Sequence, residues 1–126
     1  MNRRQEIGKI GEGAAVAYLK KKRYQIIERN HWKPWGELDI IARAPDTTLV
    51  FVEVKTIYTD LTNKSNKFIN PEDNMTRAKI VKTKRAAEVY ANAHKKLVTD
   101  KGWRIDLIAV LIDGEGEPKI THYESI

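Results

Sequence analysis

Two carboxylates and a lysine on neighbouring segments could cleave a phosphodiester bond with the help of a divalent metal ion. Asp39 lies among aliphatic residues, and Glu53 and Lys55 alternate with valines further along the chain. Side chains alternate between the two faces of a strand, so Glu53 and Lys55 share one face. The turn residues Pro45–Thr48 lie between the two runs. We therefore expect a hairpin that brings Asp39 close to Glu53 and Lys55.

The chemistry of these side chains fits Mg²⁺ or Mn²⁺, because hard cations prefer oxygen ligands and often use only one or two carboxylates. The metal activates a water and neutralises charge on the phosphate, and a lysine beside it orients or deprotonates that water or stabilises developing charge. A salt bridge on a solvated sheet face is the alternative for Glu53 and Lys55. Asp39 fits that alternative less well, since a carboxylate among aliphatic residues needs a partner. Glu37, next to it but on the other face, is secondary.

Length and composition limit the class of protein. The chain has 126 residues and no cysteine, which predicts one domain, residues 1–126, without disulfides or thiolate chemistry. No apolar run is long enough for a bilayer, and no apolar signal core follows the first residues. We expect a cytoplasmic protein that does not enter membranes. The three histidines lack metal-binding spacing, which favours structural or surface roles for His31, His94 and His122.

Positive charge is concentrated in the segment from Arg77 to Arg104. This segment holds nine Lys or Arg against Glu88 and Asp100, a net charge of +7, while the whole chain carries +6. A concentrated basic stretch favours a polyanionic partner, and nucleic acid is the first candidate. A solvated helix face is the alternative. The residues predicted to contact nucleic acid are Lys79, Lys82, Arg85 and Lys96.

Apolar spacing predicts a helix from about Arg4 to Lys22, followed by a strand from Tyr24 to Asn30. The inner face of this helix is expected to hold Ile7, Ile10, Ala14, Ala17 and Tyr18. A turn with two tryptophans follows at His31–Gly36. Its rings could stack on bases, or they could cover the sheet as a hydrophobic lid, and we favour the lid.

A polar stretch at Thr56–Asn74 follows the predicted hairpin, and it could border a substrate. The second helix begins either at Asn70–Pro71 or after Thr76, and it continues to about Leu97. On a helical wheel Lys82, Arg85 and Lys96 lie opposite its apolar side. Strands are expected at Arg104–Ile112 and Lys119–Tyr123. This order of elements predicts an α/β fold with a mixed sheet flanked by helices.

The same motifs resemble the small bacterial YraN-like proteins, which are similar to archaeal Holliday-junction resolvases. Those belong to the restriction-endonuclease-like superfamily, whose core motif is PD-(D/E)XK. The resemblance covers nearly the whole chain and rests on these segments: Gly11-Glu12-x-x-Ala15-x-x-Tyr18-Leu19, Arg29-Asn30, Gly36–Ala42, Val50–Lys55 and Arg104–Ile108.

Carried over to this chain, the resemblance makes Asp39 and Glu53 metal ligands and Lys55 the catalytic lysine. Glu12 matches a helix-borne acid of the resolvase site and would complete the metal shell. The family often has arginine two residues after the catalytic lysine, where this chain has Ile57. The family also often has glycine at position 23, where this chain has Arg23.

Two functions follow as hypotheses. The first is a Mg²⁺- or Mn²⁺-dependent DNA endonuclease acting on branched DNA or recombination intermediates, with a homodimer able to cut two symmetric strands. The second is a nucleic-acid-binding protein on a nuclease scaffold with weak or no cleavage. The set of Asp39, Glu53 and Lys55 favours the first, and Ile57 keeps the second open.

Overall fold

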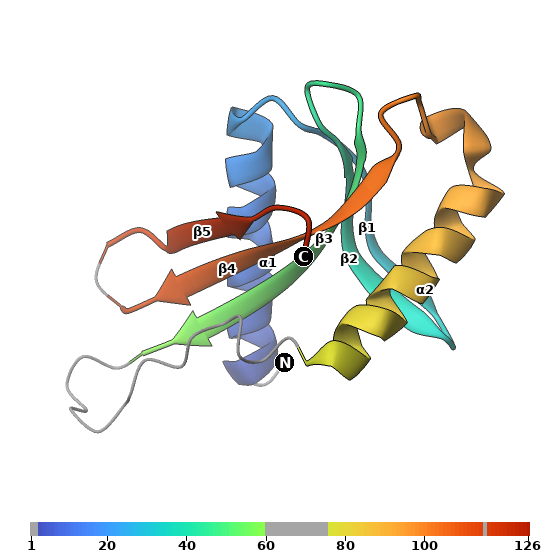
Figure 1. The fold of residues 1–126 in the computed structure, drawn as a ribbon. Helices are drawn as coiled ribbons and strands as arrows, with labels where there is room; N and C mark the ends of the chain where they lie inside the picture. Colours follow the sequence, from blue (N-terminus) through green and yellow to red (C-terminus); the bar gives the residue numbers. More distant parts are fainter. Residues whose placement is uncertain (1–2, 60–75, 115) are drawn as a thin grey trace.

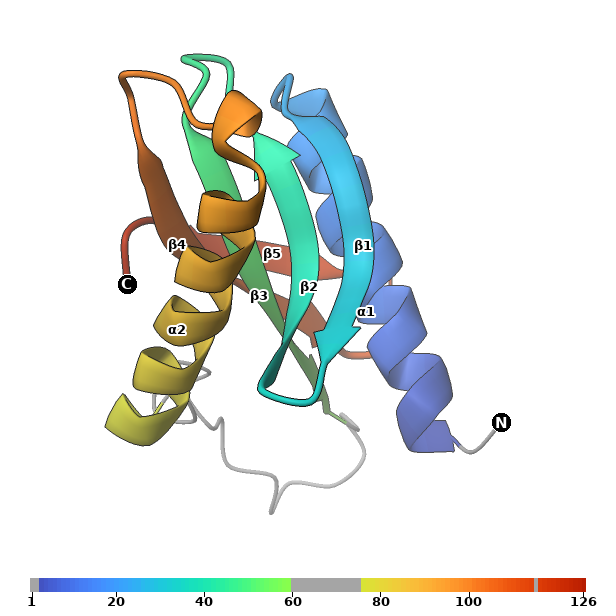
Figure 2. The same cartoon turned by 90° about the vertical axis from the view of Figure 1, so that its right-hand side faces the viewer.

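A five-stranded mixed sheet with a helix against each face forms the fold (Figures 1 and 2). The computed structural model describes residues 3–59, 76–114 and 116–126. The elements are α1 (Arg3–Lys21), β1 (Gln25–Lys33), β2 (Gly36–Arg43), β3 (Leu49–Tyr58), α2 (Arg77–Ala93), the short 3-10 helix η2 (Lys95–Leu97), β4 (Trp103–Ile112) and β5 (Lys119–Tyr123).

The strands lie in the order β1-β2-β3-β4-β5. β3 and β4 are parallel and are joined through α2, and the other neighbouring pairs are antiparallel. This confirms the predicted α/β class with a mixed sheet flanked by helices, and the arrangement is consistent with a restriction-endonuclease-like fold. The strands expected near Arg104–Ile112 and at Lys119–Tyr123 are confirmed.

Alternating side chains of β3 build two separate hydrophobic cores. Val50 and Val52 pack with residues of α1, whereas Leu49 and Phe51 pack with residues of α2. The ring of Phe51 meets that of Tyr90 edge-on, with 5.7 Å between ring centroids. Because β3 is covered on both faces, its sequence is almost continuously apolar until Glu53 interrupts it.

The sheet divides into two arms where β2 and β3 stop pairing. Their ladder ends at the pair formed by Ile40 and Val52. β2 continues beside β1 as far as Gly36, whereas β3 continues beside β4 as far as Tyr58. Figures 1 and 2 show the two arms diverging. Backbone groups on the facing edges of the arms therefore need partners from outside the sheet.

β1 is irregular at Asn30, whose φ of 52° lies in the left-handed region. Arg29 forms an ion pair with α1, whereas His31 packs against α2, 4.9 Å from the ring centroid of Tyr90. Side chains two positions apart normally share a face, so Asn30 shifts the alternation of β1 by one residue. A register shift also occurs earlier in the strand, after Ile26.

The predicted turn at His31–Gly36 is present but shorter than expected, because β1 runs to Lys33 and only Pro34 and Trp35 form the turn. The predicted hydrophobic lid is also wrong. Trp32 is 68% exposed and Trp35 is 47% exposed, so neither ring covers the sheet.

The predicted inner face of α1 is only partly correct. Ala15, Val16 and Leu19 are buried, whereas Ala17 is exposed and Ile10 is 54% exposed. The other predicted inner residues are half-buried: Ile7, Ala14 and Tyr18. The helix is rotated because Gly11 lets it approach β3 closely, which turns the line of positions 11, 15 and 19 toward the sheet.

α2 begins immediately after Thr76, whose Oγ1 accepts a hydrogen bond from the backbone N–H of Lys79 at 3.2 Å. This confirms the later of the two predicted starts. The helix ends at Ala93 and not near Leu97 as expected, because His94 leaves the helical conformation with a φ of −129°. Lys96 consequently lies in η2 and does not share a sector of α2 with Lys82 and Arg85.

The first residues of the predicted polar stretch at Thr56–Asn74 belong to β3, which ends at Tyr58. The rest of that stretch, together with the alternative helix start at Asn70–Pro71, falls mainly in residues 60–75, outside the described residues.

Adding a methyl group at Gly11 should destabilise the fold, because a Cβ there would overlap the side chain of Thr56. We expect Gly11→Ala to lower the free energy of unfolding by up to about 2 kcal/mol, since overpacking costs about 1–3 kcal/mol and better helix propensity returns about 1. Gly13→Ala is the matched control, because nothing lies within 4 Å of its added Cβ. Urea denaturation should show a gain for the control, and equal changes in the two variants would contradict the packing argument.

Candidate functional site

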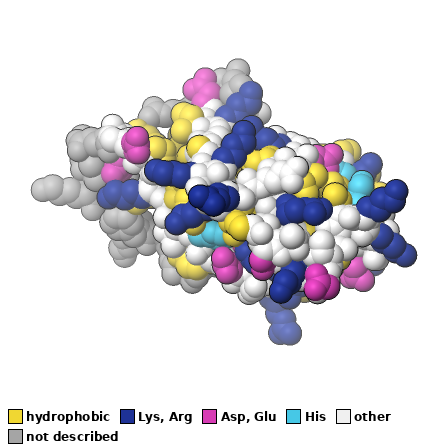
Figure 3. Space-filling view, turned by 90° about the horizontal axis from the view of Figure 1, so that it is seen from above, with side chains coloured by type: hydrophobic (Ala, Val, Ile, Leu, Met, Phe, Trp, Pro, Cys, Tyr) yellow, Lys and Arg dark blue, Asp and Glu magenta, His cyan; other side chains and the backbone are white. Residues whose placement is uncertain are grey.

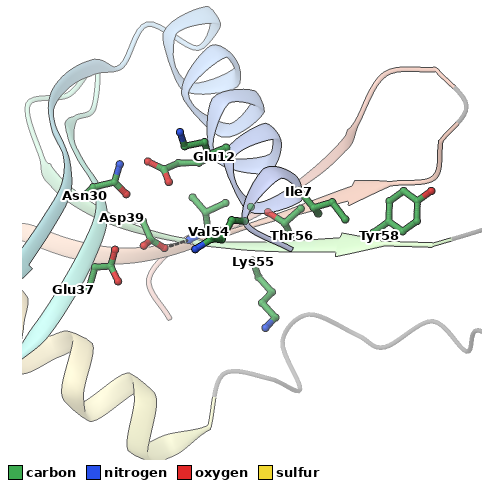
Figure 4. Close-up of a pocket in the computed structure, with 12 residues that line it drawn as sticks. Ile7, Glu12, Asn30, Glu37, Asp39, Val54, Lys55, Thr56 and Tyr58 are labelled. Carbon is green, nitrogen blue, oxygen red and sulfur yellow. Dashed lines mark hydrogen bonds between the residues drawn. The ribbon is translucent and has the colours of Figure 1, made fainter. Parts of the chain in front are cut away.

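Asp39 lies where the two arms of the sheet separate. It directly precedes Ile40, where the pairing of β2 with β3 ends. Its Oδ2 accepts a hydrogen bond of 2.9 Å from the backbone N–H of Val54, drawn as a dashed line in Figure 4. This hydrogen bond from a side chain replaces the backbone hydrogen bond that Val54 would make if β2 continued beside β3. The main chain of β3 thereby fixes the carboxyl group of Asp39.

Glu53 meets Asp39 at this point, and their side chains share a hydrogen bond. Both side chains are half-buried. A hydrogen bond between two carboxyl groups requires a proton on one of them. The predicted hairpin and the convergence of Asp39 with Glu53 are therefore confirmed, whereas their predicted roles as metal ligands stay a prediction.

Burial raises the pKa of both carboxyl groups. The pKa of Asp39 rises from 3.8 to about 6, first by desolvation and then by the nearby charges of Glu37 and Glu12. The pKa of Glu53 rises from 4.5 to about 8, first by desolvation and then by the charge of Asp39. Two adjacent carboxylates in a partly desolvated place cannot both ionise easily. Groups with such perturbed pKa values gather at functional sites more often than elsewhere.

Glu12 reaches the same region from α1. Figure 4 shows its side chain above Asp39, on the α1 side of β3. Its Oε1 is buried and has no hydrogen-bond partner among the described residues, and it forms an ion pair with Arg29, whose Nε lies 3.5 Å away. A buried carboxylate oxygen without a hydrogen bond is costly, so this atom is suited to an additional ligand.

Lys55 lies two positions beyond Glu53 on β3 and is half-buried. Figure 4 shows its side chain pointing away from Glu12, toward the opposite side of the strand. Glu12 and Lys55 therefore lie on opposite faces of the sheet at the fork, defined as the point beyond the pair of Ile40 and Val52 where β2 and β3 separate, with Asp39 between them.

Two pockets meet at this place. The larger has a volume of about 1170 Å³ and is lined by Glu12, Asn30, Asp39 and Lys55, among others. The smaller, of about 180 Å³, contains Glu53 and also borders Asp39. Glu37 lines both pockets. An extended substrate could thus pass the carboxyl pair along an open surface.

The predicted nucleic-acid-binding residues fall into two groups. Lys79 and Lys82 line the smaller pocket beside Glu53, and the charge of Lys79 lowers the pKa of that carboxyl group. Arg85 is exposed but lines neither pocket, and Lys96 lies in η2, beyond the far end of α2 (Figure 1). The structure therefore brings two of the four basic residues to the carboxyl pair.

Basic side chains are not restricted to α2. Figure 3 views the end of the molecule that holds the end of α1, the β2–β3 turn and η2, and Lys and Arg side chains are spread over it among acidic and apolar ones. This end lies away from the fork. Its charge can add to long-range attraction of a polyanion, but it cannot position one at Asp39.

Sequence reasoning missed the role of Asn30 and undervalued Glu37. Asn30 lines the larger pocket, and its left-handed φ re-aims the β1–β2 arm at that point. Glu37 lies close enough to raise the pKa of both Asp39 and Glu53. Two signals for Asn30 were available: its place in the Arg29-Asn30 segment of the family resemblance, and its residue type, since asparagine is enriched at positive φ.

A second polar cluster surrounds Asp106 at the far side of the sheet. Ligand atoms of Asp106, His122 and Glu124 lie within 4.8 Å of one another, and no other group of three qualifies in the described parts of the chain. Asp106 accepts hydrogen bonds from His122 Nε2 at 2.8 Å, Arg104 Nε at 3.0 Å and Ser125 N at 3.0 Å. The guanidinium of Arg104 already neutralises this carboxylate, so the cluster acts first as a link between β4 and the end of the chain.

The raised pKa values predict how stability depends on pH. Below their ordinary values of 3.8 and 4.5 both carboxyl groups are protonated in the folded and unfolded states, and their contribution is fully present. As pH rises from these values, the unfolded chain releases protons that the folded state still holds, so stability falls until pH has passed the folded pKa values of about 6 and about 8. We expect Glu53→Gln to remove the later part of this fall and to raise the melting temperature above pH 8 by a few degrees.

Glu88→Gln, which changes an exposed carboxylate of α2, is the control and should leave the pH profile as it is. Melting curves recorded from pH 5 to pH 9 test the expectation. Parallel profiles for the wild type and Glu53→Gln would show that the two carboxyl groups do not share a proton.

The chain resembles a series of bacterial proteins along almost its full length. It is 38% identical to a UPF0102 protein of Syntrophomonas wolfei over 122 residues, covering 97% of this chain and 96% of that protein. It is 42% identical to a UPF0102 protein of Bacteroides thetaiotaomicron over 117 residues, covering 93% and 88%. A solved structure of a protein of unknown function from Silicibacter pomeroyi matches with a TM-score of 0.35 and 13% identity, covering 91% of this chain and 71% of that one.

No helix in residues 3–59, 76–114 and 116–126 combines the length and the apolar character needed to cross a membrane.

The family model described as "Uncharacterised protein family UPF0102" matches residues 11–110, which include the fork, both carboxyl groups and the start of α2. This match confirms the resemblance to the YraN-like proteins. The chain belongs to the UPF0102 family.

Proposed function

We propose that this protein is a metal-dependent DNA endonuclease that hydrolyses phosphodiester bonds in branched DNA or recombination intermediates. The observation that carries the proposal is the carboxyl pair of Asp39 and Glu53, held with a shared hydrogen bond where two pockets meet. Lys55 and Lys79 border the same pockets. Acidic ligands with lysines beside them suit a phosphodiester better than a neutral or cationic substrate.

The acidic residues fit a hard divalent cation such as Mg²⁺ or Mn²⁺. Glu12 Oε1 is buried without a hydrogen bond and has only a long ion pair, 3.5 Å from Arg29 Nε, and the charges of Glu37 and Glu12 both raise the pKa of Asp39. Asp39, Glu53 and Glu12 would hold the ion, which would supply Lewis-acid activation of water and neutralisation of phosphate charge. Glu53 has to give up its proton before the pair can serve as an anionic ligand, so binding should weaken at low pH.

The lysines have distinct roles in this proposal. Lys55 borders the larger pocket beside Asp39, where its ammonium can hold a phosphate oxygen, or where its neutral amine can take a proton from the attacking water. Lys79 and Lys82 border the smaller pocket, where they can bind phosphates on the α2 side. A strand of DNA that crosses the fork would then meet positive charge on both sides of the carboxyl pair.

A binding protein with little or no cleavage is the second candidate. It is favoured by Ile57, which stands on β3 at a position where the family often has arginine. An aliphatic side chain cannot contribute a charge-assisted bond to phosphate. In this case the carboxyl pair would be a retained feature of the scaffold. Only the endonuclease candidate calls for a homodimer, because two copies of the chain would be needed to cut both strands of a symmetric junction.

Cleavage assays distinguish the two candidates. Fluorescent single-stranded, duplex and four-way-junction DNA should be incubated with the protein and Mg²⁺, Mn²⁺ or EDTA. We expect metal-dependent cutting that Lys55→Ala reduces about 100-fold or more, since proton transfer and charge stabilisation by one group are worth about that much. Asp39→Asn keeps an oxygen for the N–H of Val54 and should abolish cutting as well.

Lys84→Ala is the matched control, because this lysine of α2 is exposed and lines neither pocket. Its activity should equal that of the wild type. If the wild type cuts none of the three DNA forms at any metal concentration while still binding them, the second candidate replaces the first.

The position of the lysines predicts a difference in salt dependence. Each phosphate contact contributes about 0.9 to the slope of log affinity against log salt concentration on duplex DNA. The double variant Lys79→Ala/Lys82→Ala should flatten this slope by up to about two units. The double variant Arg85→Ala/Lys96→Ala removes the same charge away from the pockets and should flatten it less. Anisotropy titrations at several salt concentrations measure both, and a reversed order would place the DNA away from the fork.

A further inference from the structure

We propose that the tip of the β1–β2 hairpin stacks on unpaired DNA bases beside the carboxyl pair. The hairpin tip is defined here as Trp32, Lys33, Pro34, Trp35 and Gly36. This inference rests on the proposed function and adds to it the class of substrate: DNA that presents unpaired nucleotides next to the bond that is cut.

The first observation is the exposure of two large aromatic rings. Trp32 is 68% exposed and Trp35 is 47% exposed, whereas the third tryptophan, Trp103, is partly buried and packs edge-on against Phe51 with 5.7 Å between ring centroids. The two exposed rings do not stabilise the core. Their exposure leaves apolar ring faces in water at one end of an arm of the sheet, which is typical of a binding surface.

The second observation is the position of these rings relative to the site. Trp32 pairs with Glu37 across the β1–β2 ladder. Cross-strand partners point to the same face of a sheet, and Glu37 lines both pockets. The ring of Trp32 therefore stands beside the rim of the cleft that holds Asp39. A nucleotide stacked on it would lie a short distance along the strand from the carboxyl pair.

The third observation is charge. Lys33 is exposed and follows Trp32 directly, and Lys79 and Lys82 line the smaller pocket together with Gly36. The hairpin tip lies against the middle of α2, since a Cβ on Gly36 would lie 3.0 Å from the Cβ of Ala86 and 3.8 Å from the carbonyl oxygen of Lys82. Aromatic rings among cationic side chains match a nucleic-acid strand, whose bases stack and whose phosphates are anionic. A second copy of this chain would bring its own positive charge to the same place.

Unpaired bases are the specific occupant because stacking needs an open base face. In a continuous duplex each base is covered by its neighbours, whereas single strands, flaps and the centres of junctions offer free faces. The hairpin tip would thus select the structure of the DNA, and the lysines would bind its backbone irrespective of sequence.

The test is binding in EDTA, where no cleavage can occur. The probes are a short oligothymidylate and an oligonucleotide of the same length with abasic sites, which keeps the phosphates and lacks the bases. We expect the wild type to bind the first about 5- to 150-fold more tightly, from the usual strength of stacking on one base. Intrinsic tryptophan fluorescence should be quenched by the first probe only.

Four variants test the assignment to the hairpin tip. Trp32→Ala/Trp35→Ala should bind both probes with the same, weaker affinity. Trp32→Phe/Trp35→Phe should keep the preference for bases by anisotropy but lose the quenching, because only Trp103 remains as a fluorophore. Val89→Ala, which trims an exposed apolar residue of α2, and Lys84→Ala should behave as the wild type.

Equal affinity of the wild type for the two probes would overturn the inference and leave the endonuclease proposal intact. A loss of self-association in Trp32→Ala/Trp35→Ala, with unchanged DNA binding, would also overturn it and make the hairpin tip a contact between copies. Base-dependent quenching in a protein that cuts no DNA would support the inference while the endonuclease proposal fails.

Discussion

The separation of β2 from β3 is the constraint on which the site depends. Both strands are needed in the centre of the sheet, yet their ladder ends at Ile40 and Val52, and each continues with another neighbour. A backbone N–H at such a fork has to find a partner outside the ladder. Asp39 supplies it for Val54, and this places an acidic group among apolar layers. Glu53 follows Val52 directly on β3, so the second carboxyl group arrives at the same place through the alternation of the strand.

This arrangement works against stability at the site and needs support elsewhere. Two carboxyl groups with raised pKa values disfavour the folded state once both must ionise. The support comes from β3 and β4, which are parallel neighbours covered by both helices, and from Asp106, which is fully buried and whose pKa is held below its usual range by hydrogen bonds from His122, Ser125 and Arg104. Asp106 is fully partnered, whereas Asp39 and Glu53 are not. This is the contrast expected between a structural and a functional position.

Three features could be predicted from the sequence: the class of fold, the order of strands along the chain and the meeting of Asp39 with Glu53. They depend on the alternation of apolar and polar residues and on turn residues, which act over short distances. The sequence did not allow the rotation of α1 to be predicted, since that depends on how closely Gly11 approaches a strand far along the chain. The exposure of Trp32 was missed for a similar reason. Its face is set by the left-handed residue Asn30, and a single residue of positive φ inside a strand leaves no periodic signal. Glu12 entered only through resemblance, because a helix surface gives no hint of what lies opposite.

The irregularity of β1 has a consequence for how copies of the protein can meet. β1 is the outer strand on its side of the sheet, and outer strands carry unpaired backbone groups that can template the addition of a foreign strand. The register shift after Ile26 and the left-handed Asn30 break its hydrogen-bonding edge into short pieces, and Arg29 and Lys33 add exposed charge. Such an edge resists edge-to-edge aggregation. A symmetric assembly would accordingly not form by joining the β1 edges of two molecules into one continuous sheet.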